Sequence, residues 1–214
     1  MSNTKQRIIA AAVMTLIACG VAVLQYIGIP AVKYLGILIV LAMILEYTIC
    51  LRHADVAVIR KNWLTFFAFF CLLCVMLVAI NTVGTHPFFI LLLLLIICGA
   101  DIGAWFFGRL IGGDKMWERL SAKKTWAGQI AGILCGTFAG VICGLQITGT
   151  FNPTLVWLGI SIALLSQYGD LTASYIKRTL GIKDFGTIIP GHGGILDRFD
   201  GWIYALPIAW LFML

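Results

Sequence analysis

The chain has 214 residues, of which 61% are hydrophobic and 11% are charged, and its mean hydropathy is +1.02. Soluble domains carry roughly 45–50% apolar and about 25% charged residues. A soluble fold of this length could not bury so much apolar surface, so the composition indicates an integral membrane protein. The net charge of +6 does not indicate a nucleic-acid partner, because the basic residues fall in short segments between apolar runs.

Long apolar runs recur along the chain, and a helix that crosses the hydrocarbon core of a bilayer needs about 20 such residues. In chain order, they predict transmembrane helices at residues 8–26, 34–51, 63–80, 88–107, 129–145, 155–175 and 202–214. The predicted fold is therefore all-α, a polytopic membrane protein of about seven transmembrane helices. We expect one integrated membrane domain, with amino-terminal helices in residues 1–87 and a catalytic region with cytoplasmic loops in residues 88–214.

The basic residues are distributed unevenly between the two sides of the predicted membrane domain. If the spans alternate in direction, all 15 Lys and Arg residues except Lys33 fall on the side of the amino terminus. Cytoplasmic loops are enriched in Lys and Arg, so we expect the loops around Arg60, Lys123 and Lys183 to be cytoplasmic. The expected location is the inner (cytoplasmic) membrane of the cell, as a multi-pass protein whose active site faces the cytoplasm.

One predicted helix carries glycine at every fourth position. The stripe consists of Gly128, Gly132, Gly136, Gly140 and Gly144. Small residues on one face let neighbouring helices approach closely, which predicts a buried, tightly packed helix. A smooth groove that admits lipid is the alternative use of the same stripe.

Three carboxylates interrupt apolar helices, and ionisable residues at membrane depth are candidates for function. Glu46 is as consistent with a hydrogen-bonded structural residue as with a functional one. Asp101 could pair with a basic residue or line a polar cavity. Asp170 begins the densest polar segment of the chain.

Four polar residues of this segment fall on one face of a predicted helix: Asp170, Ser174, Lys177 and Arg178. A carboxylate and a hydroxyl are oxygen ligands for magnesium, whereas Lys and Arg neutralise phosphate oxygens. A solvated helix end could supply charges but would not require this grouping. The segment therefore predicts a site for a hard cation and a phosphate.

The run Pro-Gly-His-Gly-Gly at residues 190–194 allows a sharp turn and a close approach to a ligand. The next element presents Asp197 and Asp200, which could complete a metal site with Asp170. His192 contacts phosphate or orients a ligand, or else it is a structural or surface residue.

The string from residue 174 to residue 200 resembles the signature of phosphatidate cytidylyltransferases, also called CDP-diacylglycerol synthases. It reads Ser174-x2-Lys177-Arg178-x4-Lys183-Asp184-x5-Pro190-Gly191-His192-Gly193-Gly194-x2-Asp197-Arg198-x-Asp200. Segments 101–109 and 121–128 are similar to the family's second conserved region, so the resemblance covers roughly the carboxy-terminal half. Members commonly have Pro and Glu at the positions that Ala122 and Ala127 occupy here.

The resemblance implies that the phosphate of phosphatidate attacks the α-phosphorus of CTP and releases pyrophosphate, giving CDP-diacylglycerol for phospholipid biosynthesis. It implies a Mg²⁺ site, with room for a second cation. The implied metal ligands are Asp170, Ser174, Asp197 and Asp200. The further residues implied in catalysis are Lys177, Arg178 and Arg198. The expected substrate-binding residues are Lys123, Lys124, Thr125, Trp126, Lys183, His192, Gly193 and Gly194.

Two other functions stay open at this point. A cytidylyltransferase that acts on a different lipid phosphate would use the same nucleotide chemistry. A membrane transporter or ion channel could also use intramembrane carboxylates, but it predicts inverted repeats and broken helices, and the sequence has no such repeat. The expected partners are CTP, phosphatidate and the lipid bilayer, with no nucleic acid, and a homodimer is one option for the oligomeric state.

Overall fold

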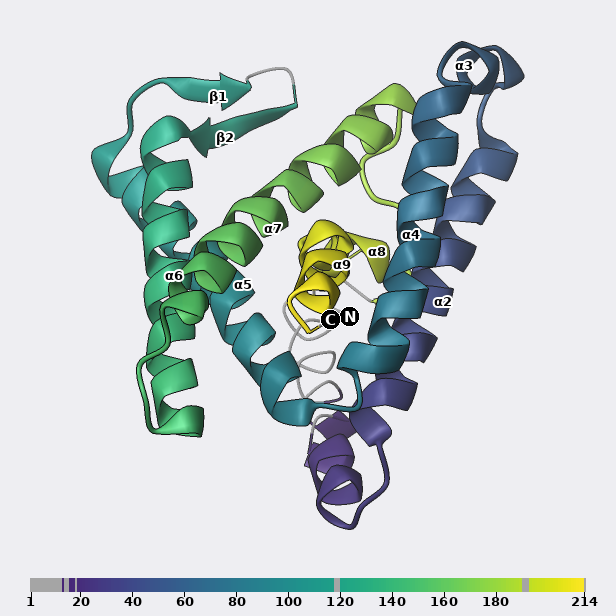
Figure 1. The fold of residues 1–214 in the computed structure, drawn as a ribbon. Helices are drawn as coiled ribbons and strands as arrows, with labels where there is room; N and C mark the ends of the chain where they lie inside the picture. Colours follow the sequence, from purple (N-terminus) through teal and green to yellow (C-terminus); the bar gives the residue numbers. More distant parts are fainter. Residues whose placement is uncertain (1–12, 14–15, 18, 118–119, 190–192, 214) are drawn as a thin grey trace. The chain divides into compact units, whose positions relative to one another are not determined.

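The computed structural model describes residues 13, 16–17, 19–117, 120–189 and 193–213. Five of its helices are long and apolar enough to cross a membrane (Figure 1). They are α2 (Ala31–His53), α4 (Trp63–Val83), α5 (Pro87–Ile111), α6 (Trp126–Thr148) and α7 (Pro153–Thr179). The prediction of an all-α, multi-pass membrane protein is confirmed.

Each of these helices contains one predicted span and extends it by a few residues at one or both ends. The last predicted span, residues 202–214, corresponds to α9 (Trp202–Leu211), an apolar helix of 10 residues. That length is short of the roughly 20 residues that a membrane crossing requires. The first predicted span, residues 8–26, lies mostly outside the described residues, although residues 19–26 are helical. The count of seven spans stays a prediction.

Four short elements in the polar connections were not predicted. They are the helices α3 (Val56–Lys61) and α8 (Leu196–Phe199) and the strands β1 (Lys115–Trp117) and β2 (Ser121–Thr125). The two strands form an antiparallel hairpin in which Lys115 pairs with Thr125 and Trp117 pairs with Ser121. The hairpin leads directly into α6, so its last residues lie at the amino-terminal end of that helix.

The chain divides into two compact units, which are described separately. The first unit comprises Met1–Pro87 and Ile176–Phe199, and the second comprises Phe88–Tyr175 and Asp200–Leu214. Segments distant in the sequence thus fold together within each unit. Helix α7 contributes its last residues to the first unit and the rest to the second.

In the first unit, α2 packs along α4, and α8 packs against α2. Tyr47 of α2 is fully buried and donates a hydrogen bond to the carbonyl oxygen of Phe66, at 2.8 Å. Its ring packs against Phe69, with centroids 5.0 Å apart, and Phe185 stacks on Phe69 at 6.5 Å. Phe185 belongs to the loop between α7 and α8, so this aromatic cluster fixes the start of that loop against two helices.

In the second unit, the glycine stripe of α6 packs against α5 and α7. All five of its glycines are buried. A Cβ atom at Gly136 would lie 2.7 Å from the carbonyl oxygen of Ile96 and 2.9 Å from the Cβ of Ala163. A side chain there would collide with both neighbours. The prediction of a buried, closely packed helix face is confirmed, and a lipid-admitting groove along the stripe is excluded.

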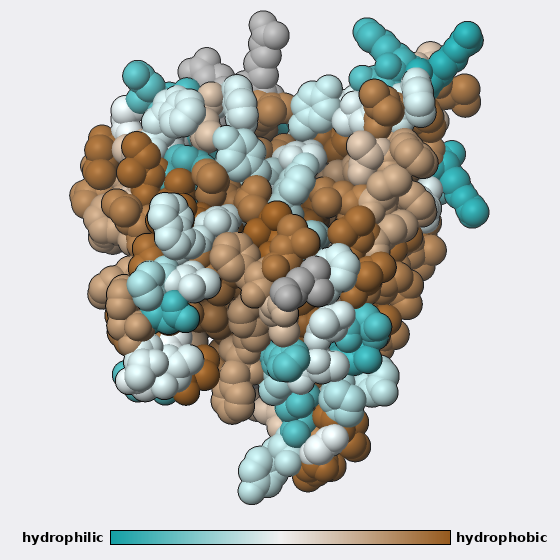
Figure 2. Space-filling view, in the orientation of Figure 1, coloured by the Kyte–Doolittle hydropathy of each residue, from teal (hydrophilic) through white to brown (hydrophobic). Residues whose placement is uncertain are grey.

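The outer face of α6 is apolar and exposed. Ile130, Leu134 and Phe138 lie on this face, and 58–68% of each residue's surface is accessible. Figure 2 shows hydrophobic residues over much of the visible surface. Large contiguous apolar areas of this kind are typical of a protein that is solvated by lipid.

Candidate active site

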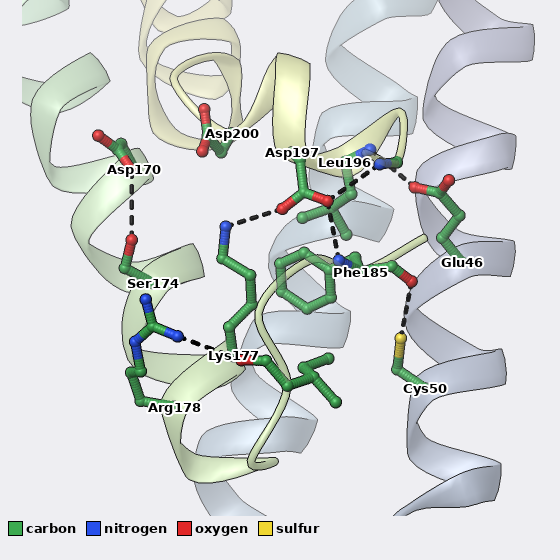
Figure 3. Close-up of polar contacts among 12 residues, drawn as sticks. Glu46, Cys50, Asp170, Ser174, Lys177, Arg178, Phe185, Leu196, Asp197 and Asp200 are labelled. Atoms are coloured by element: carbon green, nitrogen blue, oxygen red, sulfur yellow. Dashed lines mark hydrogen bonds and ion pairs between the residues drawn. The ribbon is translucent and has the colours of Figure 1, made fainter. Parts of the chain in front are cut away.

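The second unit joins the β hairpin to α7 through an ion pair. Lys124 Nζ lies 2.5 Å from Asp170 Oδ2, and the two side chains are 28% and 40% exposed. Ser174, one turn further along α7, donates a hydrogen bond to Asp170 Oδ1 at 3.4 Å (Figure 3). Asp101 of α5 lies close enough to Asp170 and Lys124 to interact electrostatically with both. The unit therefore gathers two carboxylates, a hydroxyl and an ammonium group in an accessible region.

The residues next to Lys124 divide between structural and exposed positions. Thr125 is buried and caps α6, because its hydroxyl accepts a hydrogen bond from the amide of Gly128 at 3.2 Å. Trp126 is 53% exposed at the first position of the helix. The side chain of Lys123 lies outside the described residues. The sequence already contained a signal for this cap, since Thr is a preferred residue just before the first turn of a helix.

Asp200 approaches α7 through its backbone. Its carbonyl oxygen contacts Gly169 so closely that no side chain could be accommodated there. Asp200 Oδ1 accepts a hydrogen bond from the amide of Gly201 at 2.9 Å. Gly169 therefore allows the residues before α9 to lie against the turn of α7 that carries Asp170.

The first unit contains a second ion pair, which is more deeply buried. Lys177 Nζ lies 2.7 Å from Asp197 Oδ1, and the side chains are 12% and 4% exposed. Asp197 Oδ2 accepts hydrogen bonds from the amides of Phe185, at 2.8 Å, and Gly194, at 3.1 Å (Figure 3). The ammonium group of Lys177 also lies 5.5 Å from the centre of the Phe185 ring. Asp197 thus holds together the end of α7, the following loop and α8.

The glycine-rich run turns at Gly193, which has a φ of +88°. Residues with a side chain rarely adopt this conformation. The carbonyl oxygen of Gly193 accepts a hydrogen bond from the amide of Ile189 at 2.9 Å, which closes the turn. Pro190, Gly191 and His192 lie outside the described residues, so the role of His192 stays a prediction.

The remaining predicted cations lie at the surface of the first unit. Arg178 Nη1 donates a hydrogen bond to the carbonyl oxygen of Ile182 at 3.4 Å, across the turn that ends α7. Lys183 and Arg198 are exposed. Their exposure is compatible with binding a phosphate, and their roles stay predictions.

Glu46 is the functional candidate for which the structure adds most. Only 3% of the surface of Glu46 is exposed, and its two carboxylate oxygens accept hydrogen bonds from the amides of Ile195 and Leu196. The sequence singled out this carboxylate as unusual, but it gave no partner for it.

The oxygen donors present are those that Mg²⁺ prefers, namely carboxylates and a hydroxyl. Asp170, Ser174 and Asp200 belong to the second unit, and Asp197 belongs to the first. Among the described residues, no three His, Cys, Asp or Glu side chains form a metal-ligand cluster. The donor types fit a hard divalent cation, and the magnesium site stays a prediction.

The whole chain, residues 1–214, matches the model of a family described as the cytidylyltransferase family. A phosphatidate cytidylyltransferase of Brucella suis is 37% identical over 132 residues, which are 60% of this chain and 49% of the relative. One from Staphylococcus haemolyticus is 40% identical over 126 residues, 58% of this chain and 48% of the relative.

A phosphatidate cytidylyltransferase of Staphylococcus epidermidis is 42% identical over 121 residues, 56% of this chain and 46% of the relative. The chain therefore spans about half the length of the curated relatives it matches.

Proposed function

The chain belongs to the cytidylyltransferase family, and from this membership we propose that it transfers CMP from CTP to phosphatidate. The products are CDP-diacylglycerol and pyrophosphate. Relatives that are 37–42% identical to it over the matched 121–132 residues are named phosphatidate cytidylyltransferases, which supports this substrate pair.

In the proposed reaction, a phosphate oxygen of phosphatidate attacks the α-phosphorus of CTP. The bond from that phosphorus to the oxygen that bridges it to the β-phosphorus breaks, and pyrophosphate leaves with the electron pair. Such transfers depend mainly on positioning and on neutralising charge. Residues of this chain provide cations for the phosphates, and we assign Lys124, Lys177 and Arg178 to this task.

We assign Asp170, Ser174 and Asp197 as ligands of Mg²⁺, with Asp200 as an additional ligand. When bound, the ion would neutralise phosphate oxygens and help to orient CTP. The accessible carboxylate of Asp170 and the hydroxyl of Ser174 are suited to bind it. Lys124, beside Asp170, is placed to bind a phosphate oxygen of the nucleotide or lipid.

One observation carries the proposal: an accessible carboxylate, a hydroxyl and an ammonium group meet where the β hairpin leads into the apolar helix α6. Asp170, Ser174 and Lys124 supply these groups. A lipid phosphate presents its charged group at the membrane surface, so its enzyme needs cations and metal ligands where spanning helices end. We further propose that this end faces the cytoplasm, because all Lys and Arg residues except Lys33 would fall on that side if the seven predicted spans alternate in direction.

The test is an assay of the purified protein with CTP, phosphatidate and Mg²⁺. Pyrophosphate release and a CDP-diacylglycerol product identified by mass spectrometry are the expected results. Release only with another lipid phosphate would identify a cytidylyltransferase of different specificity. Absence of release with every lipid phosphate, from protein that is folded and monodisperse, would overturn the proposal.

A further inference from the structure

A buried carboxylate of the amino-terminal half binds the backbone that precedes Asp197. Glu46 lies in α2 and is 3% exposed. Its Oε1 accepts a hydrogen bond from the amide of Ile195 at 3.0 Å. Its Oε2 accepts one from the amide of Leu196 at 2.8 Å (Figure 3). Both oxygens of this buried carboxylate are thus hydrogen-bonded to backbone amides, as buried polar groups require.

Two glycines lie so close to this carboxylate that a Cβ atom at either position would displace it. A Cβ atom at Gly186 would lie 2.5 Å from Glu46 Oε1, and one at Gly194 would lie 2.6 Å from Glu46 Oε2. Neither glycine has a positive φ. The position of the Glu46 carboxylate, and not backbone conformation, therefore favours glycine at these two positions.

The same short backbone segment also binds Asp197. The amide of Gly194 donates to Asp197 Oδ2, whereas the next two amides donate to Glu46. The three consecutive amides are thus shared between two carboxylates. A displacement of this segment away from Glu46 would move the Asp197 carboxylate and its contact with Lys177.

We propose that Glu46 is a positioning residue, whose carboxylate fixes residues 194–196 and thereby sets the position of Asp197. This proposal rests on the proposed cytidylyltransferase function, in which Asp197 takes part in binding the metal. It assigns a role in the carboxy-terminal site to a residue of the amino-terminal half. Glu46 itself does not touch the substrates.

Glu46→Gln tests this role because it preserves the shape of the side chain. One carboxylate oxygen becomes an amide NH₂ group, which would face the amide of Ile195 or Leu196 as donor against donor. A hydrogen bond to a charged group is stronger than one between neutral groups. We therefore expect amide exchange at residues 194–196 to rise about tenfold or more, because a tenfold change corresponds to about 1.4 kcal/mol.

Hydrogen–deuterium exchange of the purified full chain measures this effect without requiring catalysis. Asp55→Asn is a matched control, since Asp55 is an exposed cap of α3 in the same unit and Asn caps equally well. The control should leave exchange at residues 194–196 unchanged. Exchange of Ile195 and Leu196 in the wild type at the rate of an exposed loop would overturn the proposal, even if no Glu46 variant could be purified.

Enzyme kinetics provide the second readout. Glu46→Gln should lower kcat about tenfold or more and raise the magnesium concentration needed for half-maximal rate. The KM for CTP should change much less. A purely structural role would lower thermal stability while leaving the magnesium requirement of the folded fraction as in the wild type, and that result would overturn the proposal. If the wild type shows no cytidylyl transfer, the proposed function fails, whereas the exchange experiment still decides whether Glu46 anchors the segment.

Discussion

Lys124 of β2 and Asp170 of α7 form an ion pair across the second unit, with 2.5 Å between Nζ and Oδ2. Both side chains are partly exposed, and partly exposed pairs contribute only about 0–1 kcal/mol to stability. The ion pair therefore contributes little to the stability of the fold. We propose that the pair, which lies beside Ser174, serves instead to bind a charged substrate.

We expect Lys124→Gln to reduce CDP-diacylglycerol formation by roughly 10²-fold, a typical loss when one group that stabilises charge is removed. The thermal midpoint should change little, since the pair contributes at most about 1 kcal/mol. Lys115→Gln is the matched control, because Lys115 is an exposed lysine of the same hairpin. Equal activity of the two variants would show that Lys124 does not act on the substrate.

Asp170 and Asp197 should differ in their effects on stability. Asp197→Asn breaks an ion pair whose side chains are 12% and 4% exposed, and loss of one partner from a buried pair costs roughly 3–5 kcal/mol. Asp170→Asn affects a side chain that is 40% exposed, so its thermal midpoint should stay near that of the wild type. Thermal unfolding in one detergent compares the variants, and equal midpoints for both would contradict the burial described for Asp197.

The glycine stripe allows a graded prediction. Gly136→Ala should destabilise the protein by about 1–3 kcal/mol, because the new methyl group meets the carbonyl oxygen of Ile96, which belongs to the backbone of α5. Gly144→Ala should cost less, since it meets only the flexible side chain of Leu155.

Gly20→Ala is the control for the stripe, because no heavy atom lies within 4 Å of the added methyl group. The thermal midpoint in detergent should be highest for Gly20→Ala, lower for Gly144→Ala and lowest for Gly136→Ala. A midpoint of Gly136→Ala equal to that of the control would contradict the close packing of α5 and α6.

Membrane orientation is tested with single cysteines in a cysteine-free background. A cysteine at Lys183 should react with an impermeant maleimide only after the cells are permeabilised, because the basic loops are proposed to be cytoplasmic. A cysteine at Thr85, in the loop between α4 and α5, should react in intact cells. The reverse labelling pattern would invert the proposed topology.

The sequence predicted the long helices well because an apolar run of about 20 residues is by itself enough to indicate a membrane-spanning helix. Residues 63–80 and 155–175, for example, lie within α4 and α7. The hairpin was missed because Lys115–Trp117 and Ser121–Thr125 are short and lie outside the long apolar runs. The glycine period of α6 predicted its packing face because one residue type repeats at the helical spacing.

The site was predictable in part. Asp170 and Ser174 stand four residues apart on one helix, so the sequence alone placed them on one face. The partner of Glu46 could not be predicted, since its contact with Ile195 joins positions 149 residues apart in the sequence. The pairing of Lys124 with Asp170 could not be predicted for the same reason, because it depends on how the hairpin before α6 folds back toward α7.

The most direct test of the central claim is magnesium-dependent conversion of CTP and phosphatidate to CDP-diacylglycerol by the wild type, Asp170→Asn, Asp197→Asn and the double variant. The wild type should be active only with a divalent cation, and each single variant should lose nearly all activity. The double variant should be little worse than either, because a metal site emptied by one change has little left to lose. Substantial activity of Asp170→Asn at an unchanged magnesium requirement would contradict the account.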